Sequence, residues 1–186
     1  MLQLYQKIKQ LKVLEFFFKY PYDEFYLREL GRGLDINPMT MKRALDTLVE
    51  DNLVLRYQKK NQILYKANIE NPTFRYLKIS YNLKLIEDMG VIKLIKEKTR
   101  GLVSIVLYGS MAEGKDDLSS DVDLLTILPK QKWKPESELK EKLGRDVSVI
   151  QMSIPEWTQE AKRNRGLYID IITNGIVLFG LMPVVE

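Results

Sequence analysis

The sequence contains neither cysteine nor histidine. Without cysteine, the chain has no disulfide, no thiolate zinc site and no thiol nucleophile. Without histidine, serine–histidine hydrolysis and metal sites built from imidazole are excluded as well. Any bound metal must therefore be held by oxygen atoms, which favours Mg²⁺ or Mn²⁺ over zinc.

The sequence also lacks a long apolar run. No stretch of about 18 consecutive apolar residues occurs, so we expect no membrane-spanning segment and no membrane partner. The first residues, MLQLYQKIKQLKVL, carry too much charge for a secretory signal. With 45% hydrophobic and 29% charged residues, the 186-residue chain fits one large globular domain or two small ones. We therefore expect a soluble cytoplasmic protein.

Charge is unevenly distributed along the chain. Residues 1–100 contain 19 basic and 12 acidic residues, whereas residues 101–186 contain 10 and 13. This asymmetry indicates two modules with different partners, one of which binds a polyanion. The alternative interpretation is an accident of surface composition.

The first seventy residues show helical periodicity followed by two short strand patterns. Apolar residues recur every three or four positions from Leu4, which predicts an amphipathic helix ending before Pro21. A second helix is expected over residues 26–34. A third begins after Asn37, a good N-cap, with Pro38 as its first residue. The segments NLVLRYQ and QILYKAN then predict a hairpin that turns around residues 59–61.

This order of elements, and the stretch FYLRELGRGLDINPMTMKRALDTLVEDNLVLRY, resemble winged helix-turn-helix transcriptional regulators. The resemblance implies that the third helix enters the major groove of double-stranded DNA and that the hairpin tip contacts phosphates. A protein–protein or dimerisation module is the alternative, because acidic residues dilute the basic charge of residues 1–70. The DNA-binding residues implied by the resemblance are Asn37, Met39, Thr40, Lys42, Arg43, Lys59 and Lys60.

Residues 71–100 predict a helical connector. A stripe of apolar residues continues from Phe74 to Ile95 at helical spacing, with a break or bend near Gly90. We interpret this stripe as core or as a homodimer interface. Arg100 and Gly101 are typical of a helix end.

The segment VLYGSMAEGKDDLSSDVDLLTIL, residues 106–128, contains a pattern typical of phosphate and metal binding. A buried strand leads to Gly109-Ser110, where a helix over residues 110–118 is expected to begin. Asp121 and Asp123 then open a second strand, on which alternate residues share a face. Two adjacent carboxylates repel each other unless a cation lies between them, and N–H groups at a helix start favour a phosphate. The pattern therefore predicts Mg²⁺ bound together with a nucleoside triphosphate.

The order Gly-Ser-x-Ala-x-Gly and then Ser-Asp-x-Asp-Leu is similar to the signature of the minimal nucleotidyltransferases of the DNA polymerase β superfamily. The similarity extends over residues 102–181. It implies transfer of a nucleoside monophosphate to a small molecule or to a protein acceptor, as in antitoxin-like members that adenylylate a partner. The resemblance implies metal ligation and catalysis by Asp121 and Asp123, and nucleotide binding by Gly109, Ser110, Gly114 and Ser120.

The third carboxylate of that superfamily is missing at its expected position. In the strand GRDVSVIQM the corresponding slot falls on Ser148, and Asp146 lies two residues earlier on the same face. Asp146 is retained as a third candidate catalytic residue that requires a shifted strand. We interpret Asp116, Asp117 and Asp170 as solvated surface charges. Two functions stay open: a nucleotidyltransferase, or a transcriptional regulator whose degenerate domain only senses nucleotide.

Together these patterns predict an α+β chain of two domains. Residues 1–70 are expected to form the winged helix, residues 71–100 the connector, and residues 101–186 an α/β nucleotidyltransferase fold with a small mixed sheet.

Overall fold

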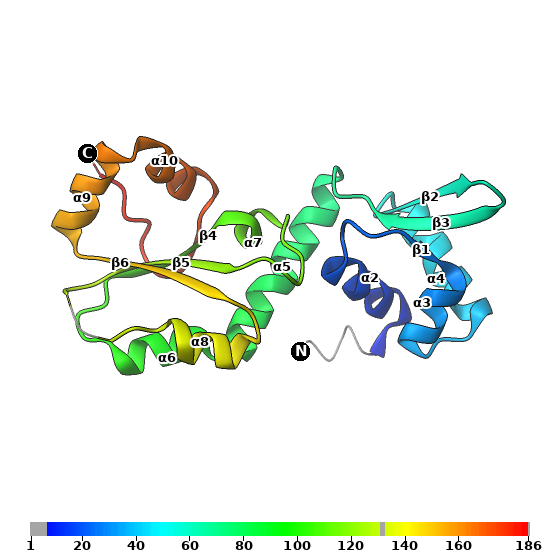
Figure 1. Ribbon diagram of the computed structural model, residues 1–186, viewed down its shortest axis with the longest axis horizontal. Helices are drawn as coiled ribbons and strands as arrows, with labels where there is room; N and C mark the ends of the chain where they lie inside the picture. Colours follow the sequence, from blue (N-terminus) through cyan, green and yellow to red (C-terminus); the bar gives the residue numbers. More distant parts are fainter. Residues whose placement is uncertain (1–6, 131–132, 186) are drawn as a thin grey trace. The chain divides into compact units, whose positions relative to one another are not determined.

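A computed structural model describes residues 7–130 and 133–185 (Figure 1). The chain divides into two compact units, one ending at Tyr81 and the other beginning at Asn82. The division falls inside helix α5 (Pro72–Asp88), which contributes residues to both units. The sequence division had placed its boundaries after residues 70 and 100.

The first unit contains helices α2 (Lys9–Lys19), α3 (Leu27–Leu34) and α4 (Pro38–Glu50). Helix α4 begins as its sequence predicts, because Asn37 Oδ1 accepts a hydrogen bond from the backbone N–H of Thr40 at 2.9 Å and Pro38 occupies the first turn. The prediction for the first helix extends into residues 1–6, which lie outside the described part of the chain.

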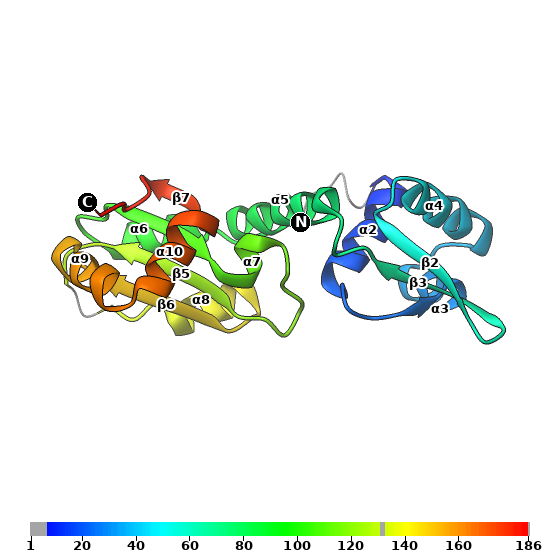
Figure 2. The same cartoon turned by 90° about the horizontal axis from the view of Figure 1, so that it is seen from above.

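A three-stranded antiparallel sheet completes this unit. Strands β1 (Phe25–Tyr26), β2 (Val54–Lys59) and β3 (Gln62–Ala67) are arranged in the order β1-β3-β2. Strands β2 and β3 pair from Val54↔Ala67 to Lys59↔Gln62, which confirms the predicted hairpin and leaves a two-residue turn (Figure 2). Lys60 in that turn has a φ of 55°, the left-handed conformation that such tight turns require.

Aromatic side chains form much of the core of the first unit. Phe17, Phe18 and Phe74 are fully buried, and the Phe18 and Phe74 rings meet edge to face at 5.2 Å between centroids. The N-terminal part of α5 therefore packs into this core. Lys78 on the same helix is buried and donates a hydrogen bond to the backbone carbonyl of Phe18.

The second unit is built on a four-stranded mixed sheet. Its strands are β4 (Ser104–Tyr108), β5 (Val122–Ile127), β6 (Val147–Met152) and β7 (Ile176–Gly180), in the order β6-β5-β4-β7. Strand β4 runs antiparallel to β5 and β7, whereas β5 and β6 are parallel. The small mixed sheet and the α+β class agree with the prediction.

Helices cover both faces of this sheet (Figure 1). On one face, α5, α6 (Val91–Lys98) and α8 (Glu136–Leu143) enclose an apolar cluster that includes Leu107, Val122 and Leu124. On the other face, α9 (Ile154–Arg163) and α10 (Arg165–Asn174) pack on Val106 and Leu125. The predicted break at Gly90 is confirmed, because α5 ends before it and its φ of 67° interrupts the helix.

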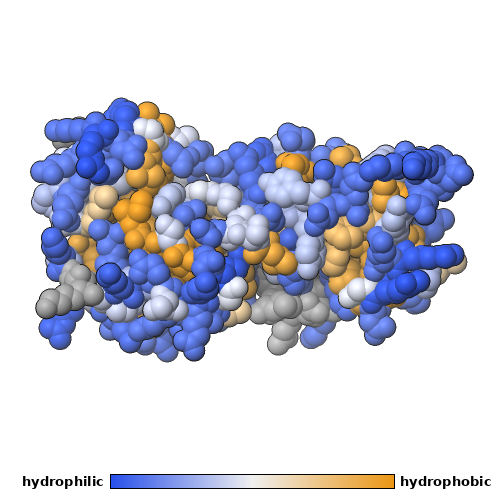
Figure 3. Space-filling model, in the orientation of Figure 1, coloured by the Kyte–Doolittle hydropathy of each residue, from blue (hydrophilic) through white to orange (hydrophobic). Residues whose placement is uncertain are grey.

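The face seen in Figure 3 is predominantly hydrophilic, and its apolar side chains lie in separate patches. Within the described residues, every helix is too short or too polar to cross a membrane.

Candidate functional site

The turn from β4 into the short helix α7 (Gly109–Glu113) requires glycine at its first position. Gly109 has a φ of 71°, and a Cβ placed there would lie 2.5 Å from Asp123 Oδ2. A side chain at position 109 would thus occupy the space of the Asp123 carboxylate, besides straining the backbone. The glycine allows this carboxylate to lie against the turn that the sequence predicts to bind phosphate.

Asp121 and Asp123 lie at the beginning of β5, beside this turn. Val122 and Leu124 are fully buried in the opposite face, as the alternation predicts. Burial, and then the neighbouring charge of Asp121, raise the pKa of the Asp123 carboxyl. A bound cation would relieve this repulsion, so the two carboxylates fit an oxygen-ligated divalent ion.

Strand register places Ser148 directly beside Asp123. The parallel pairing of β5 with β6 matches Asp123 with Ser148, which is the slot where the sequence comparison expected a third carboxylate. Asp146 lies just before β6, and its carboxylate is paired with Lys140 at an exposed position. Within residues 7–130 and 133–185, no three acidic side chains gather closely enough to hold a metal ion.

Tyr108 is a site residue that sequence reasoning missed. It pairs with Asp123 across β4 and β5 and is only 8% exposed. Burial, the charge of Asp123 and the charge of Asp170 raise the pKa of the Tyr108 hydroxyl to about 12. A hydrogen bond with Ser148 opposes this rise. The negative charge of Asp123 thus disfavours ionisation of the neighbouring hydroxyl. The position of Tyr108 as the last residue of a buried strand was the available signal.

The loop between α7 and β5 is ordered by its own polar groups. The predicted helix over residues 110–118 is shorter than expected, because Gly114 adopts a φ of 68° and ends it after Glu113. Asp117 Oδ1 then accepts hydrogen bonds from the backbone N–H groups of Ser119 at 2.8 Å and Ser120 at 3.0 Å. The Ser119 hydroxyl, and with it these backbone bonds and the Ser120 hydroxyl, lower the pKa of the Asp117 carboxyl. Ser120 thus shapes the loop through Asp117.

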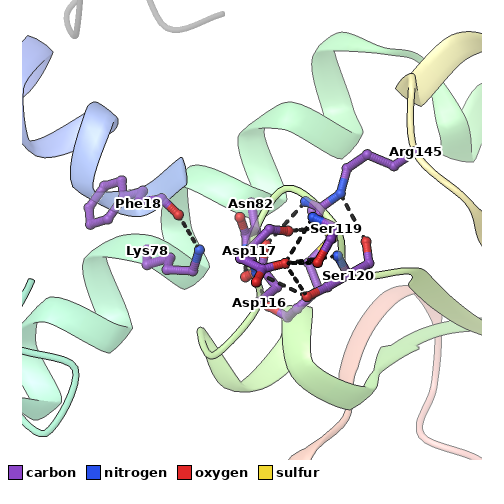
Figure 4. A network of polar contacts seen from close by, with 9 residues as sticks. Phe18, Lys78, Asn82, Asp116, Asp117, Ser119, Ser120 and Arg145 are labelled. Carbon is purple, nitrogen blue, oxygen red and sulfur yellow. Dashed lines mark hydrogen bonds and ion pairs between the residues drawn. The ribbon is translucent and has the colours of Figure 1, made fainter. Parts of the chain in front are cut away.

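Asp116 is buried, contrary to its interpretation as a solvated surface charge. It is 2% exposed, and Arg145 Nη1 pairs with its Oδ2 at 3.1 Å (Figure 4). Asn82 Nδ2 donates to the other carboxylate oxygen at 2.8 Å and to the Met111 carbonyl at 3.0 Å. Both partners lie far away in the sequence, 29 and 34 residues from Asp116, so local patterning gives no sign of them.

The seven residues predicted to bind DNA form two groups within the first unit. Five lie at or near the N-terminus of α4, where Lys42 and Arg43 are exposed and Met39 is 62% exposed. The other two are at the hairpin tip. Lys59 Nζ pairs there with Glu24 Oε2 at 3.0 Å, which neutralises part of the tip's positive charge.

Comparisons with known proteins bear mainly on the second unit. Residues 91–181 match the family model described as polymerase beta, nucleotidyltransferase. The matched stretch lies within the second unit and includes β4, α7 and β5. No curated protein matches the chain.

Similar solved structures include the crystal structure of a toxin-antitoxin with AMP-PNP. It is 23% identical with a TM-score of 0.40, over 49% of this chain and 71% of that one. A mutant of the toxin-antitoxin MntA-HpeT is 22% identical with a TM-score of 0.38, over 50% of this chain and 72% of that one.

Proposed function

We propose that the chain binds a Mg²⁺–nucleoside triphosphate at the β4–α7–β5 site and transfers its nucleoside monophosphate to a hydroxyl acceptor on a protein or small molecule. One observation carries the proposal: the Asp123 carboxylate lies against Gly109, next to Asp121, inside a matched nucleotidyltransferase domain. The acceptor oxygen attacks the α-phosphorus, pyrophosphate leaves, and the acceptor proton passes to water.

Each site residue has a separate role in this proposal. Asp121 and Asp123 hold the divalent ion, which when bound neutralises phosphate charge. Backbone N–H groups at Gly109 and Ser110 bind phosphate oxygens. The Tyr108 hydroxyl forms a hydrogen bond with Ser148, the residue that pairs with Asp123 across β5 and β6. The acceleration then comes from positioning and electrostatics, because Ser148 is a poor proton acceptor.

For the first unit we propose binding to double-stranded DNA through a winged helix-turn-helix. The order of three helices and a hairpin supports this, as do the capped start of α4 and its exposed Lys42 and Arg43. The pairing of Lys59 with Glu24 reduces the charge available for phosphate contacts at the hairpin tip. We assign most of the affinity to α4 for that reason.

A second candidate function rests on Ser148. Since a serine lies beside Asp123 where a third carboxylate is expected, and Asp146 is paired with Lys140, the domain would bind nucleotide without transferring it. The chain would then be a DNA-bound regulator that senses nucleotide.

Label transfer distinguishes the two functions. The protein is incubated with Mg²⁺ and each nucleoside triphosphate labelled at the α-phosphorus, with protein and small-molecule acceptors, and labelled products are separated. The transferase proposal expects transfer that disappears in Asp121→Asn and Asp123→Asn. Tight nucleotide binding without transfer to any acceptor would favour the sensor.

Where transfer is found, Asp146→Asn tests the remaining candidate base. We expect its rate to stay within about threefold of wild type, because an exposed carboxylate already paired with Lys140 offers little general-base catalysis. A loss of a hundredfold or more would assign the base to Asp146.

A further inference from the structure

Arg145 connects three acceptors of the loop that precedes Asp121. Its side chain is 9% exposed, and its Nε donates to the Ser120 carbonyl at 3.1 Å. Nη1 pairs with the Asp116 carboxylate at 3.1 Å, and Nη2 donates to the Asp117 carbonyl. A planar guanidinium can serve three acceptors at once in fixed directions, whereas a lysine ammonium acts as a compact point charge.

Asp116 is held from a second side by helix α5. Its carboxylate accepts hydrogen bonds from both Arg145 and Asn82, and Asn82 also donates to the Met111 carbonyl on α7 (Figure 4). Asn82 is 1% exposed. The three side chains thus join α5, α7, the loop and the start of β6 within the second unit.

Stability alone does not account well for this arrangement. A buried ion pair loses much of its hydration, and apolar side chains of similar volume are often at least as stabilising. A satisfied buried network does, however, fix one geometry. Here the network fixes the backbone of Ser120, the residue directly before Asp121, because Arg145 Nε donates to the Ser120 carbonyl.

We propose that Arg145, supported by Asp116 and Asn82, is a positioning residue that holds the loop of residues 114–121 so that Asp121 and Asp123 share one divalent cation. Arg145 directly precedes Asp146, whose carbonyl accepts a hydrogen bond from Val122 N–H at 2.9 Å. The Arg145 side chain therefore connects the loop to the start of β6, the strand that pairs with β5. A preformed loop avoids the loss of conformational freedom that ordering it upon metal binding would require. This inference rests on the proposed function.

Arg145→Lys tests the proposal in the full-length protein. Lysine keeps the charge opposite Asp116 but loses the fixed fork to the two carbonyls. We expect faster hydrogen exchange at the amides of residues 115–121 in the metal-free protein. In calorimetric titration with ATP present, we expect Mn²⁺ to bind about tenfold to a hundredfold more weakly, as for other residues that orient metal ligands.

Arg163→Lys is the matched control. Arg163 pairs with Glu160 at 2.6 Å, but its side chain is 81% exposed and lies on α9. This variant is expected to match wild type in loop exchange and in Mn²⁺ affinity. If Arg145→Lys does not fold, Asp116→Asn, which keeps the side-chain shape, replaces it and is expected to accelerate exchange in the same loop.

The outcomes separate this inference from the proposed function. A lower melting temperature for Arg145→Lys, with unchanged loop exchange and unchanged Mn²⁺ affinity, would make Arg145 merely structural and overturn the inference alone. Failure of the wild-type protein to bind Mn²⁺ with ATP would overturn the proposed function and this inference with it.

Discussion

At Gly109, both the backbone conformation and the position of the Asp123 carboxylate require glycine. Its left-handed backbone and the 2.5 Å approach of Asp123 Oδ2 to a Cβ at that position both oppose a larger residue. We expect Gly109→Ala to lower the free energy of unfolding by about 1–2 kcal/mol from the backbone alone. It should also abolish binding of Mn²⁺–ATP by displacing the carboxylate.

Urea denaturation and calorimetric titration check this expectation. Gly166→Ala on α10 is the control, since nothing lies within 4 Å of its Cβ and its φ is not left-handed. That variant should be neutral or slightly more stable, because alanine favours a helix over glycine. Unimpaired Mn²⁺–ATP binding by Gly109→Ala would contradict the site described here.

Asp123 gives the metal-free protein a predictable pH dependence. Because its pKa is raised in the folded state above the usual 3.8, folding favours the protonated form. Its contribution to stability is therefore fully present below pH 3.8 and declines as pH rises through the raised pKa. Asp123→Asn should consequently be more stable than wild type at pH 7 with a chelator present, and equally stable at about pH 3.

Urea unfolding at both pH values measures the difference, and Asp23→Asn, an exposed carboxylate of the first unit, is the control. Adding Mn²⁺ should reverse the order at pH 7, because wild type binds the ion more tightly than Asp123→Asn does. A wild-type protein that is already the more stable of the two at pH 7 without metal would show that Asp123 is not destabilised by its surroundings.

At the scale of elements, periodicity and turn chemistry predicted most of the fold. The amide of Asn37 and the φ-restricted Pro38 mark the start of α4 locally, and the alternation around Val122 fixes which face of β5 is buried. The prediction from local sequence was wrong for Asp116, whose burial is determined by tertiary contacts. The burial of Asp116 depends on Arg145 and Asn82, and no spacing rule relates residues so far apart in the sequence.

Helix α4 and the hairpin allow a graded test of DNA binding. We expect the double variant Lys42→Ala/Arg43→Ala to lower DNA affinity roughly tenfold and to reduce the dependence of log affinity on log salt by about 0.9 per lost phosphate contact. At the hairpin tip, Lys60→Ala should weaken binding more than Lys59→Ala, because Lys59 is already paired with Glu24.

Fluorescence anisotropy with duplex DNA at several salt concentrations measures both effects. The Glu24→Gln variant, which releases Lys59, should bind DNA more tightly than wild type. Equal affinities for all of these variants would assign the first unit to protein contacts instead of DNA.

For the whole molecule, α5 and α6 determine where the chain can be divided. Ile86, Val91 and Ile95 are at most 1% exposed in the core of the second unit. Loss of even one such side chain typically costs about 2–5 kcal/mol, a large part of a total stability of about 5–15 kcal/mol. We therefore expect a fragment of residues 82–186 to fold and a fragment of residues 101–186 to remain unfolded.

Circular dichroism during thermal unfolding decides between the two boundaries. The fragment of residues 82–186 should show one cooperative transition and bind Mn²⁺–ATP like the full chain. A cooperative transition in the fragment of residues 101–186 would show that the second unit does not need α5 and α6, and would favour a separate connector.

The proposed function requires that Asp121 and Asp123 hold a divalent ion together with nucleotide. The most direct measurement is calorimetric titration of Mg²⁺–nucleoside triphosphates into wild type, Asp121→Asn and Asp123→Asn, with Asp23→Asn, an exposed residue of the first unit, as the control. We predict saturable binding by wild type and Asp23→Asn that either variant of the pair weakens at least tenfold. Binding that is unaffected in both variants, or no binding by wild type, would contradict the claim.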